Sequence, residues 1–419
     1  MSPTPADFCA DPRQDLLPVE HARARILEAV QCVTAVEQLH LRAALGRVLV
    51  EAVVANIDVP PFDNSAMDGY ALRSQDCSDT SPSVLEVIGT SFAGKPYEGK
   101  VSERQCVRIM TGAVLPEGAD AVIMQEQVER NEDQISFPGG QVGAGQNVRY
   151  AGEDSRRGDT VLEPGIKLGA AEIGLLASVG VSEVRVSRQL RVAFFSTGDE
   201  LTAVGSPLGK GQIYDSNRYT LFGLLSKLGV DCYDLGVIPD RREAVRAAFR
   251  QAGDMADLIL TSGGVSVGEA DFVTETLGEL GEINFWRMAM KPGKPLAFGR
   301  MGNAVFFGLP GNPVSVLVTF YQFVLPAIRK MSGEKQRDPM LIQARCTQDL
   351  KKAPGRMEFQ RGILKREGDG SWSVTSTGMQ GSHLLGSMSK SNCFILLAAE
   401  SGGASSGELV TVQPFLDLV

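Results

Sequence analysis

The chain has 419 residues, a formal net charge of −9 and an isoelectric point near 5.1. This length is too great for one ordinary hydrophobic core and predicts about three domains. The acidic balance argues against a protein that binds nucleic acid through phosphate contacts, although a few lysines can still bind a small anion. We expect neither a membrane span nor a signal peptide, because no long apolar run or charged leader is evident.

Seven cysteines are scattered along the chain without a CxxC pair, which is typical of reduced thiols in a cytoplasmic protein. The three histidines, His21, His40 and His383, argue against a zinc site or a His-based catalytic triad. General-base chemistry is therefore expected to depend on Asp or Glu, aided by a metal.

The N-terminal part reads as two helices followed by extended chain. Apolar residues at helical spacing predict a helix over Val19–Val36, and a second is predicted over Leu39–Gly46. Val48–Val59 looks extended and ends at two prolines, which cannot continue a helix. Residues 62–150 contain short β-like runs between Gly/Pro turns and predict a β-rich module, and Ala170–Val179 is predicted to be a helix.

Strands and helices alternate between residues 190 and 332, which predicts a doubly wound α/β domain with a parallel sheet. The expected strands are Arg191–Phe195, Val230–Leu235, Leu258–Leu260 and Ala304–Phe307, and the expected helices are Asn217–Leu228, Arg242–Ala252, Ala270–Leu280 and Pro313–Met331. After Gly333 the pattern indicates a small all-β module, with strands at Met340–Cys346, Glu358–Leu364, Trp372–Thr375, Cys393–Leu397 and Leu409–Gln413.

Four loops in this α/β region are rich in glycine and in polar or charged side chains: Ser196–Glu200, Ser262–Asp271, Lys291–Pro295 and Gly308–Pro313. Each follows an apolar run that reads as a strand, and ligands of open parallel sheets bind where such loops gather. Glycines allow close backbone approach, N–H groups and hydroxyls bind oxyanions, carboxylates hold Mg²⁺, and lysines neutralise phosphate. The combination predicts a phosphorylated substrate with a divalent metal.

The charged residues of these loops, together with Asp240 after the apolar run Leu235–Ile238, are the sharpest candidates. Glu200, Asp240 and Asp271 are predicted Mg²⁺ ligands, although singly each also fits a turn, a helix cap or a first-turn acid. Lys291 and Lys294, held at fixed separation by two prolines, are predicted to form a positioned site for an anion such as phosphate, with a solvated charge pair as the alternative. The predicted substrate-binding residues of these loops are Thr197, Gly198, Ser262, Gly263, Gly264, Ser266, Pro310, Gly311, Asn312 and Pro313.

Two further loops, around Asp63 and Thr111, lie outside this region. Pro60–Tyr70 combines carboxylates, an amide, a hydroxyl and aromatics, and Met110–Ala113 is a second polar turn. Neither can be interpreted alone, since each also fits a surface turn.

Together these motifs resemble those of the molybdopterin molybdenumtransferase family, the MoeA-type proteins, to which the gephyrin E domain also belongs. The resemblance extends from about Val19 to Phe415. The matching segments are PPFDNSAMDGYA (60–71), IMTGA (109–113), STGDEL (196–201), DSN (215–217), SGGVSVGEAD (262–271), KPGKP (291–295), GLPGNPVS (308–315) and GSH (381–383).

The resemblance implies four structural parts. Residues 1–50 and 151–189 would form an elongated helical and extended dimerisation region, and residues 51–150 a β-rich insertion domain. Residues 190–333 would form the α/β molybdopterin-binding catalytic domain, and residues 334–419 a C-terminal β-barrel.

The resemblance also implies the reaction, in which adenylylated molybdopterin and molybdate give molybdenum cofactor and AMP with Mg²⁺. It implies a homodimer whose active site draws on the partner's Asp63 and Thr111. Other implied partners are the enzyme that supplies adenylylated molybdopterin and molybdoenzyme maturation factors. The resemblance also implies a substrate-binding residue at Arg287. Here the chain departs from the family pattern, which has lysine: arginine keeps the charge but changes the donor geometry.

Two rival functions remain open from the sequence. One is a non-enzymatic scaffold of the gephyrin E type, against which the presence of Glu200, Asp240, Asp271 and both lysines argues. The other is a nucleotide-pyrophosphate-cleaving enzyme built on the same α/β domain.

Overall fold

The computed structural model describes residues 16–263 and 272–415. The chain forms two compact units. Unit 1 comprises Met1–Glu37, Gly46–Val48 and Ser187–Val419, and unit 2 comprises Gln38–Leu45 and Leu49–Val186. The four domain boundaries expected from the resemblance stay predictions.

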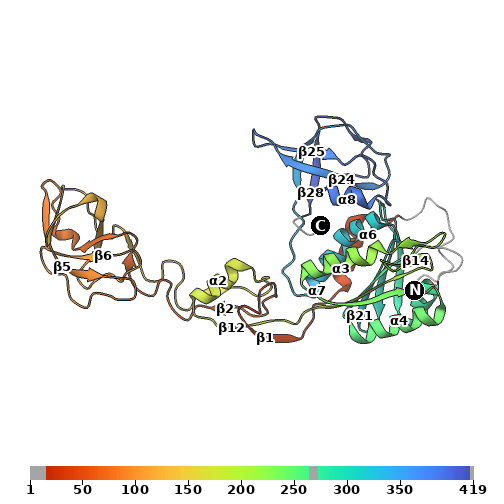
Figure 1. The fold of residues 1–419 in the computed structure, drawn as a ribbon, viewed down its shortest axis with the longest axis horizontal. Coiled ribbons are helices and arrows are strands. Elements are labelled where there is room, and N and C mark those ends of the chain that lie inside the picture. The colour runs from red at the N-terminus through yellow and green to blue at the C-terminus, as the bar shows by residue number, and fades with distance from the viewer. Residues whose placement is uncertain (1–15, 264–271, 416–419) are drawn as a thin grey trace. The chain divides into compact units, whose positions relative to one another are not determined.

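A six-stranded sheet forms the centre of unit 1, with helices on both faces (Figure 1). Its strands lie in the order β16 (Asp231–Ile238), β13 (Arg191–Thr197), β17 (Leu258–Ser262), β21 (Ala304–Leu309), β20 (Pro295–Met301) and β18 (Glu282–Arg287). The first four are parallel, but β20 is antiparallel to both of its neighbours. The doubly wound α/β class is confirmed, and the four predicted strands form the parallel part of the sheet, whereas the antiparallel strands β20 and β18 were not predicted. The β18–β20 hairpin was missed because antiparallel neighbours need no intervening helix.

Alternation along β13 shows why the sheet is covered on both faces. Val192 and Phe194 pack with α3 (Ser216–Leu228) and the helical run that begins at Pro313, whereas Phe195 packs with α4 (Arg242–Met255). Phe195 and Phe249 of α4 meet edge to face with ring centroids 5.2 Å apart. Full burial of such a side chain contributes about 1.5–3 kcal/mol, so both helix layers stabilise the sheet that carries the loops. Helix α5 (Phe272–Leu280) contributes Leu277 to the core on the same face of the sheet as α4.

The helical run over residues 313–331 comprises α6 (Pro313–Thr319), a π-helical turn (Phe320–Val324) and α7 (Leu325–Met331). It is long and apolar enough to cross a membrane by length and composition, but 83% of its most apolar window is buried inside the structure. It is therefore a core helix of unit 1. Pro326 has no N–H to donate, and the carbonyl of Gln322 four residues earlier instead accepts a bond of 3.2 Å from Arg23 Nε.

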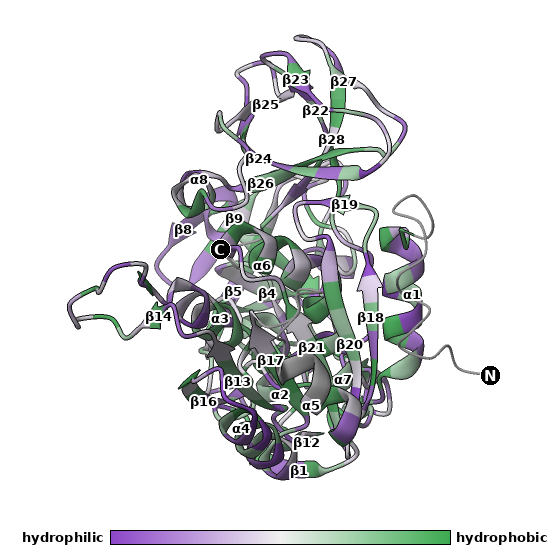
Figure 2. Cartoon of the chain, turned by 90° about the vertical axis from the view of Figure 1, so that its right-hand side faces the viewer, coloured by the Kyte–Doolittle hydropathy of each residue, from purple (hydrophilic) through white to green (hydrophobic). Residues whose placement is uncertain are grey.

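Helix α1 (Val19–Ala29) packs in the same core through its apolar face, and Figure 2 shows its green and purple bands. It is shorter than predicted. The helix expected over Leu39–Gly46 is wrong, because β1 (Val36–His40) pairs with β12 (Glu183–Ser187) and the following residues form turns. The conformation of this segment depends on a strand partner that is distant in sequence, and local periodicity cannot reveal such a partner.

The C-terminal part of unit 1 is a closed β-barrel, as expected. Its ring comprises β24 (Met357–Arg366), β25 (Trp372–Ser376), β22 (Ile342–Cys346), β28 (Leu409–Pro414) and β26 (Cys393–Leu397), which pairs back to β24. Smaller elements are the β23 (Leu350–Lys351) and β27 (Gly403–Ala404) pair and α8 (Leu385–Lys390). The short strand β19 (Met290–Lys291) leaves the α/β region and pairs with β24, so it connects the barrel to the loop that carries the two lysines.

Unit 2 is β-rich, as the short runs predicted. Its main sheet has the order β7 (Ala121–Met124), β4 (Gly69–Leu72), β6 (Gln105–Ile109), β5 (Ser83–Ser91), β9 (Gln134–Phe137) and β8 (Glu129–Asn131). Two small sheets pair β2 (Val53–Val54) with β11 (Thr160–Leu162) and β3 (Asn64–Ser65) with β10 (Val148–Arg149). Helix α2 (Ala170–Ser178) lies close to its predicted bounds.

Candidate functional site

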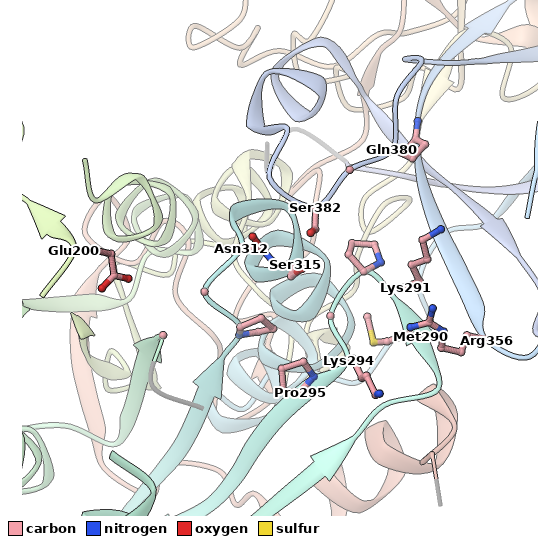
Figure 3. Close-up of a pocket in the computed structure, with 16 residues that line it drawn as sticks. Glu200, Met290, Lys291, Lys294, Pro295, Asn312, Ser315, Arg356, Gln380 and Ser382 are labelled. Carbon is pink, nitrogen blue, oxygen red and sulfur yellow. The ribbon is translucent and has the colours of Figure 1, made fainter. Parts of the chain in front are cut away.

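A cavity of about 590 Å³ opens at the carboxyl edge of the unit 1 sheet (Figure 3). This volume is within the range of small-molecule sites. The cavity is lined by the loops after β13, β17 and β21, by the β19–β20 loop, and by two loops of the barrel. The predicted residues that line it are Glu200, Gly263, Lys291, Lys294, Pro310, Gly311 and Asn312.

The other predicted residues fall into three groups. Thr197, Gly198, Asp240, Ser262, Arg287 and Pro313 belong to unit 1 but are not among the lining side chains. Asp63 and Thr111 belong to unit 2. Gly264, Ser266 and Asp271 lie outside the described residues.

Glycine is required at two turns of this edge. Gly263 has φ +89°, and a Cβ there would lie 2.8 Å from the carbonyl oxygen of Thr197. Gly198 has φ +140°, and a Cβ there would lie 2.3 Å from Glu200 Oε2. The Glu200 carboxylate therefore folds back over Gly198, and side chains at either glycine would fill space that the loop itself uses.

A buried polar network holds the strand ends below the cavity. Asn217 donates from Nδ2 to Ser262 Oγ at 2.9 Å and to the carbonyl oxygen of Gly311 at 2.7 Å. Asp215, the N-cap of α3, accepts from Ser196 Oγ at 3.1 Å. The Ser262 hydroxyl is thus engaged within the protein. Asn217 was not predicted as a site residue, although the DSN motif contains it.

Three cationic side chains come from one side of the cavity. Lys294 and Arg356 have no hydrogen-bond or ion-pair partner for their charged groups among residues 16–263 and 272–415. Lys291 forms an ion pair with Glu358, a buried residue of β24 that is 5% exposed. Two of the three cations are therefore free to meet an anion. No sequence pattern indicates Arg356 as a site residue, because its position depends on how the barrel packs.

The barrel loop that lines the cavity is held by a buried arginine. Arg361 is fully buried, and its guanidinium donates to the carbonyl oxygens of Met379, Gln380 and Gly381 at 3.3, 3.2 and 3.0 Å. Burial lowers the pKa of Arg361 to about 10. The loop thereby places Ser382 in the lining, where the only sequence signal was the GSH motif.

Barrel and helix also meet at the opening of α6. The backbone N–H of Val314 donates to the carbonyl oxygen of Ser382 at 3.0 Å. Ser315, in the first turn of α6, lines the cavity and is 4% exposed. The hydroxyls of Ser315 and Ser382 thus face the cavity from two different elements (Figure 3).

Two of the three predicted metal carboxylates belong to neighbouring loops. The backbone N–H of Asp240, after β16, donates to Asp199 Oδ1 at 3.0 Å, so its loop adjoins the loop that carries Glu200. In the described part of the chain no three His, Cys, Asp or Glu side chains form a ready metal cluster. The third predicted ligand, Asp271, lies outside the described residues.

The two polar loops of unit 2 adjoin each other. The backbone N–H of Gly112 donates to the carbonyl oxygen of Ser65 at 2.8 Å, which joins the loops of Asp63 and Thr111. Thr111 donates from its backbone N and from Oγ1 to Asp68 Oδ1 at 2.8 and 2.7 Å, and these bonds lower the pKa of the Asp68 carboxyl. Asp63 and Thr111, both exposed, thus belong to one loop cluster.

Comparison with known proteins agrees with this geometry. Residues 17–180 match the MoeA N-terminal region (domain I and II), residues 193–330 a probable molybdopterin binding domain, and residues 343–415 the MoeA C-terminal region (domain IV). A molybdopterin molybdenumtransferase of Haemophilus influenzae is 50% identical over 405 residues, which cover 96% of this chain and 100% of that protein. The chain belongs to the molybdopterin molybdenumtransferase family.

Other members of the family support the assignment. A molybdopterin molybdenumtransferase of Nostoc is 37% identical over 90% of this chain and 88% of that protein. A crystal structure of a molybdopterin biosynthesis moeA protein from Pyrococcus horikoshii has a TM-score of 0.83 at 31% identity and covers 96% of this chain and all of that one. The chain thus has the α/β sheet, the closed barrel and the β-rich unit of the family.

Proposed function

We propose that the chain inserts molybdenum into adenylylated molybdopterin, with molybdate as the oxyanion substrate and AMP as a product. The observation that carries this proposal is the pair of unpartnered cations, Lys294 and Arg356, facing the same cavity as the hydroxyls of Ser315 and Ser382. Lysine and arginine supply charge and N–H donors, and hydroxyls supply further donors to a tetrahedral oxyanion. Such a donor set suits molybdate.

The nucleotide half of the substrate would bind at the glycine loops on the other side of the cavity. Gly263 and Gly311 line it with backbone that has no side chain to block close approach. The Thr197 hydroxyl is buried, has no hydrogen-bond partner among the described residues, and would lie 3.6 Å from a Cβ at Gly263. These groups fit a pyrophosphate that lies between the molybdate end and the sheet.

Glu200 and Asp240 would hold Mg²⁺ in this proposal. Their donor chemistry fits, because Mg²⁺ in proteins commonly binds one or two carboxylates, retains several waters and completes its coordination with substrate phosphates. When bound, the ion polarises the pyrophosphate bond. The lysine and arginine on the far side hold the oxyanion in place for attack on the adenylyl phosphorus.

A homodimer is the second part of the proposal. Asp63 and Thr111 belong to unit 2, and we propose that the partner's copy of this loop cluster completes each active site. We also propose that the enzyme supplying adenylylated molybdopterin delivers it to the dimer in the cytoplasm, with molybdoenzyme maturation factors as later partners. The buried, unpaired Cys106, Cys346 and Cys393 fit a reducing compartment.

AMP release from adenylylated molybdopterin tests the proposed function. We expect release to require molybdate and to be accompanied by molybdenum cofactor that activates a molybdenum-dependent apoenzyme. Equal AMP release without molybdate would instead favour the nucleotide-pyrophosphate-cleaving enzyme. Absence of AMP release under both conditions, with substrate binding retained, would favour the scaffold.

A further inference from the structure

The ion pair between Lys291 and Glu358 is built into the junction between the α/β region and the barrel. Strand β19 pairs with β24 in parallel, and Lys291 lies in register with Glu358. Glu358 is 5% exposed, and its second oxygen accepts from Gln360 Nε2 at 2.9 Å. The Lys291 side chain is 52% exposed and reaches the cavity, whereas Glu358 lies behind it and is not among the lining residues.

This pairing changes the charge that an anion meets in the cavity. Lys291, Lys294 and Arg356 are placed on one side of the cavity, and Glu200 lies apart from them (Figure 3). Without Glu358 the three cations would present three positive charges, and the carboxylate reduces the net charge of the group to plus two. A net charge of plus two matches a dianion such as molybdate.

We propose that Glu358 is a specificity-determining residue that limits the positive charge of this cavity, so that a dianionic oxyanion is favoured over more highly charged phosphate anions. The Coulomb energy between Glu358 and a bound anion grows with the anion's charge, so the carboxylate opposes pyrophosphate more than molybdate. Its burial keeps this effect from being screened as fully as at an exposed site. The inference rests on the proposed function, because it takes molybdate as the ligand of this cavity.

Anion affinities of four proteins test it: the native chain, Glu358→Gln, Lys291→Met and the double variant. Sodium molybdate and sodium pyrophosphate are titrated calorimetrically into each, without added divalent metal. In Glu358→Gln the affinity for pyrophosphate relative to molybdate should rise on the order of tenfold, equivalent to about 1.4 kcal/mol. In Lys291→Met the same ratio should fall.

The double variant has the net charge of the native cavity, because one positive and one negative group are both removed. We therefore expect its pyrophosphate-to-molybdate ratio to return to the native value, even if both anions bind more weakly after loss of the lysine donor. If Glu358→Gln fails to fold, Lys291→Met and the double variant still give the comparison, because the ratio should fall in the first and return to the native value in the second.

Two results would overturn the inference. If Glu358→Gln weakened both anions by the same factor, the carboxylate would only position Lys291. If the ratio stayed unchanged across all four proteins, charge in the pair would not select the anion. Failure of the proposed function looks different: native protein would bind no molybdate, or Lys294→Met would bind it as well as native protein does.

Discussion

Lys294→Met isolates the contribution of one unpartnered cation to oxyanion binding. Lys294 lines the cavity, is exposed, and has no partner for its ammonium among the described residues. Its removal therefore leaves no protein carboxylate without its cation and creates no core void. The fold should be retained while the affinity for molybdate falls.

The size of the effect follows from charge and exposure. A unit charge pair about 4 Å apart interacts by ~1 kcal/mol in bulk water and ~4 kcal/mol near a protein surface. Molybdate carries two charges, but Lys294 is open to solvent, so the lower part of that range applies. We expect a loss of about 2 kcal/mol, which corresponds to roughly 30-fold weaker binding.

Calorimetric titration with sodium molybdate measures this change, with thermal unfolding as the check on folding. Lys365→Met is the matched control, because Lys365 is also an exposed lysine of unit 1 but lies seven residues beyond Glu358 on β24, a separation of about 24 Å. The control should bind molybdate normally. Native affinity in Lys294→Met, or an equal loss in Lys365→Met, would refute the assignment of the oxyanion to this cavity.

Three further predictions concern metal, dimer and pH. Glu200→Gln should abolish most AMP release with little change in melting temperature; a matching loss of stability would show a structural role. Mixing Asp63→Asn with Glu200→Gln after subunit exchange should restore part of the activity, and no recovery would place both residues in one chain's site or make Asp63 structural. Burial raises the pKa of Cys106 from its ordinary 9.0 to about 12, so the stability it contributes is present below pH 9 and is lost as pH rises toward 12. Cys106→Ala should therefore flatten the fall in melting temperature between about pH 8 and pH 11, and an unchanged slope would contradict this.

Much of the fold followed from local patterns. The bounds of β26, Cys393–Leu397, agree with the prediction, and α2, α3, α4 and β13 lie within a few residues of theirs. The misses share one cause. The segment Leu39–Gly46 begins within a strand whose partner, β12, is distant in sequence, and β18 pairs with its neighbour β20. The spacing of apolar residues reveals neither pairing.

The candidate site shows the same division. Glu200, Lys291, Lys294 and Gly311 could be found because glycines, carboxylates and lysines after successive strands gather at one edge. Arg356 could not, because it follows no strand of that sheet and reaches the cavity only through the barrel. Thr197 and Ser262 were predicted to bind substrate, yet the Ser262 hydroxyl is engaged by Asn217.

By itself the sequence determined the family, the α/β and β-barrel classes and the loops that carry charge, because these depend on residue order, periodicity and motif. Tertiary structure alone decided which charges are free. Lys291 and Lys294 are equivalent in the sequence, three residues apart in one motif. The pairing of β19 with β24 places the buried Glu358 beside Lys291, so one lysine is neutralised while the other is not. Such a difference arises from a contact between segments 67 residues apart, for which neither local motif contains a signal.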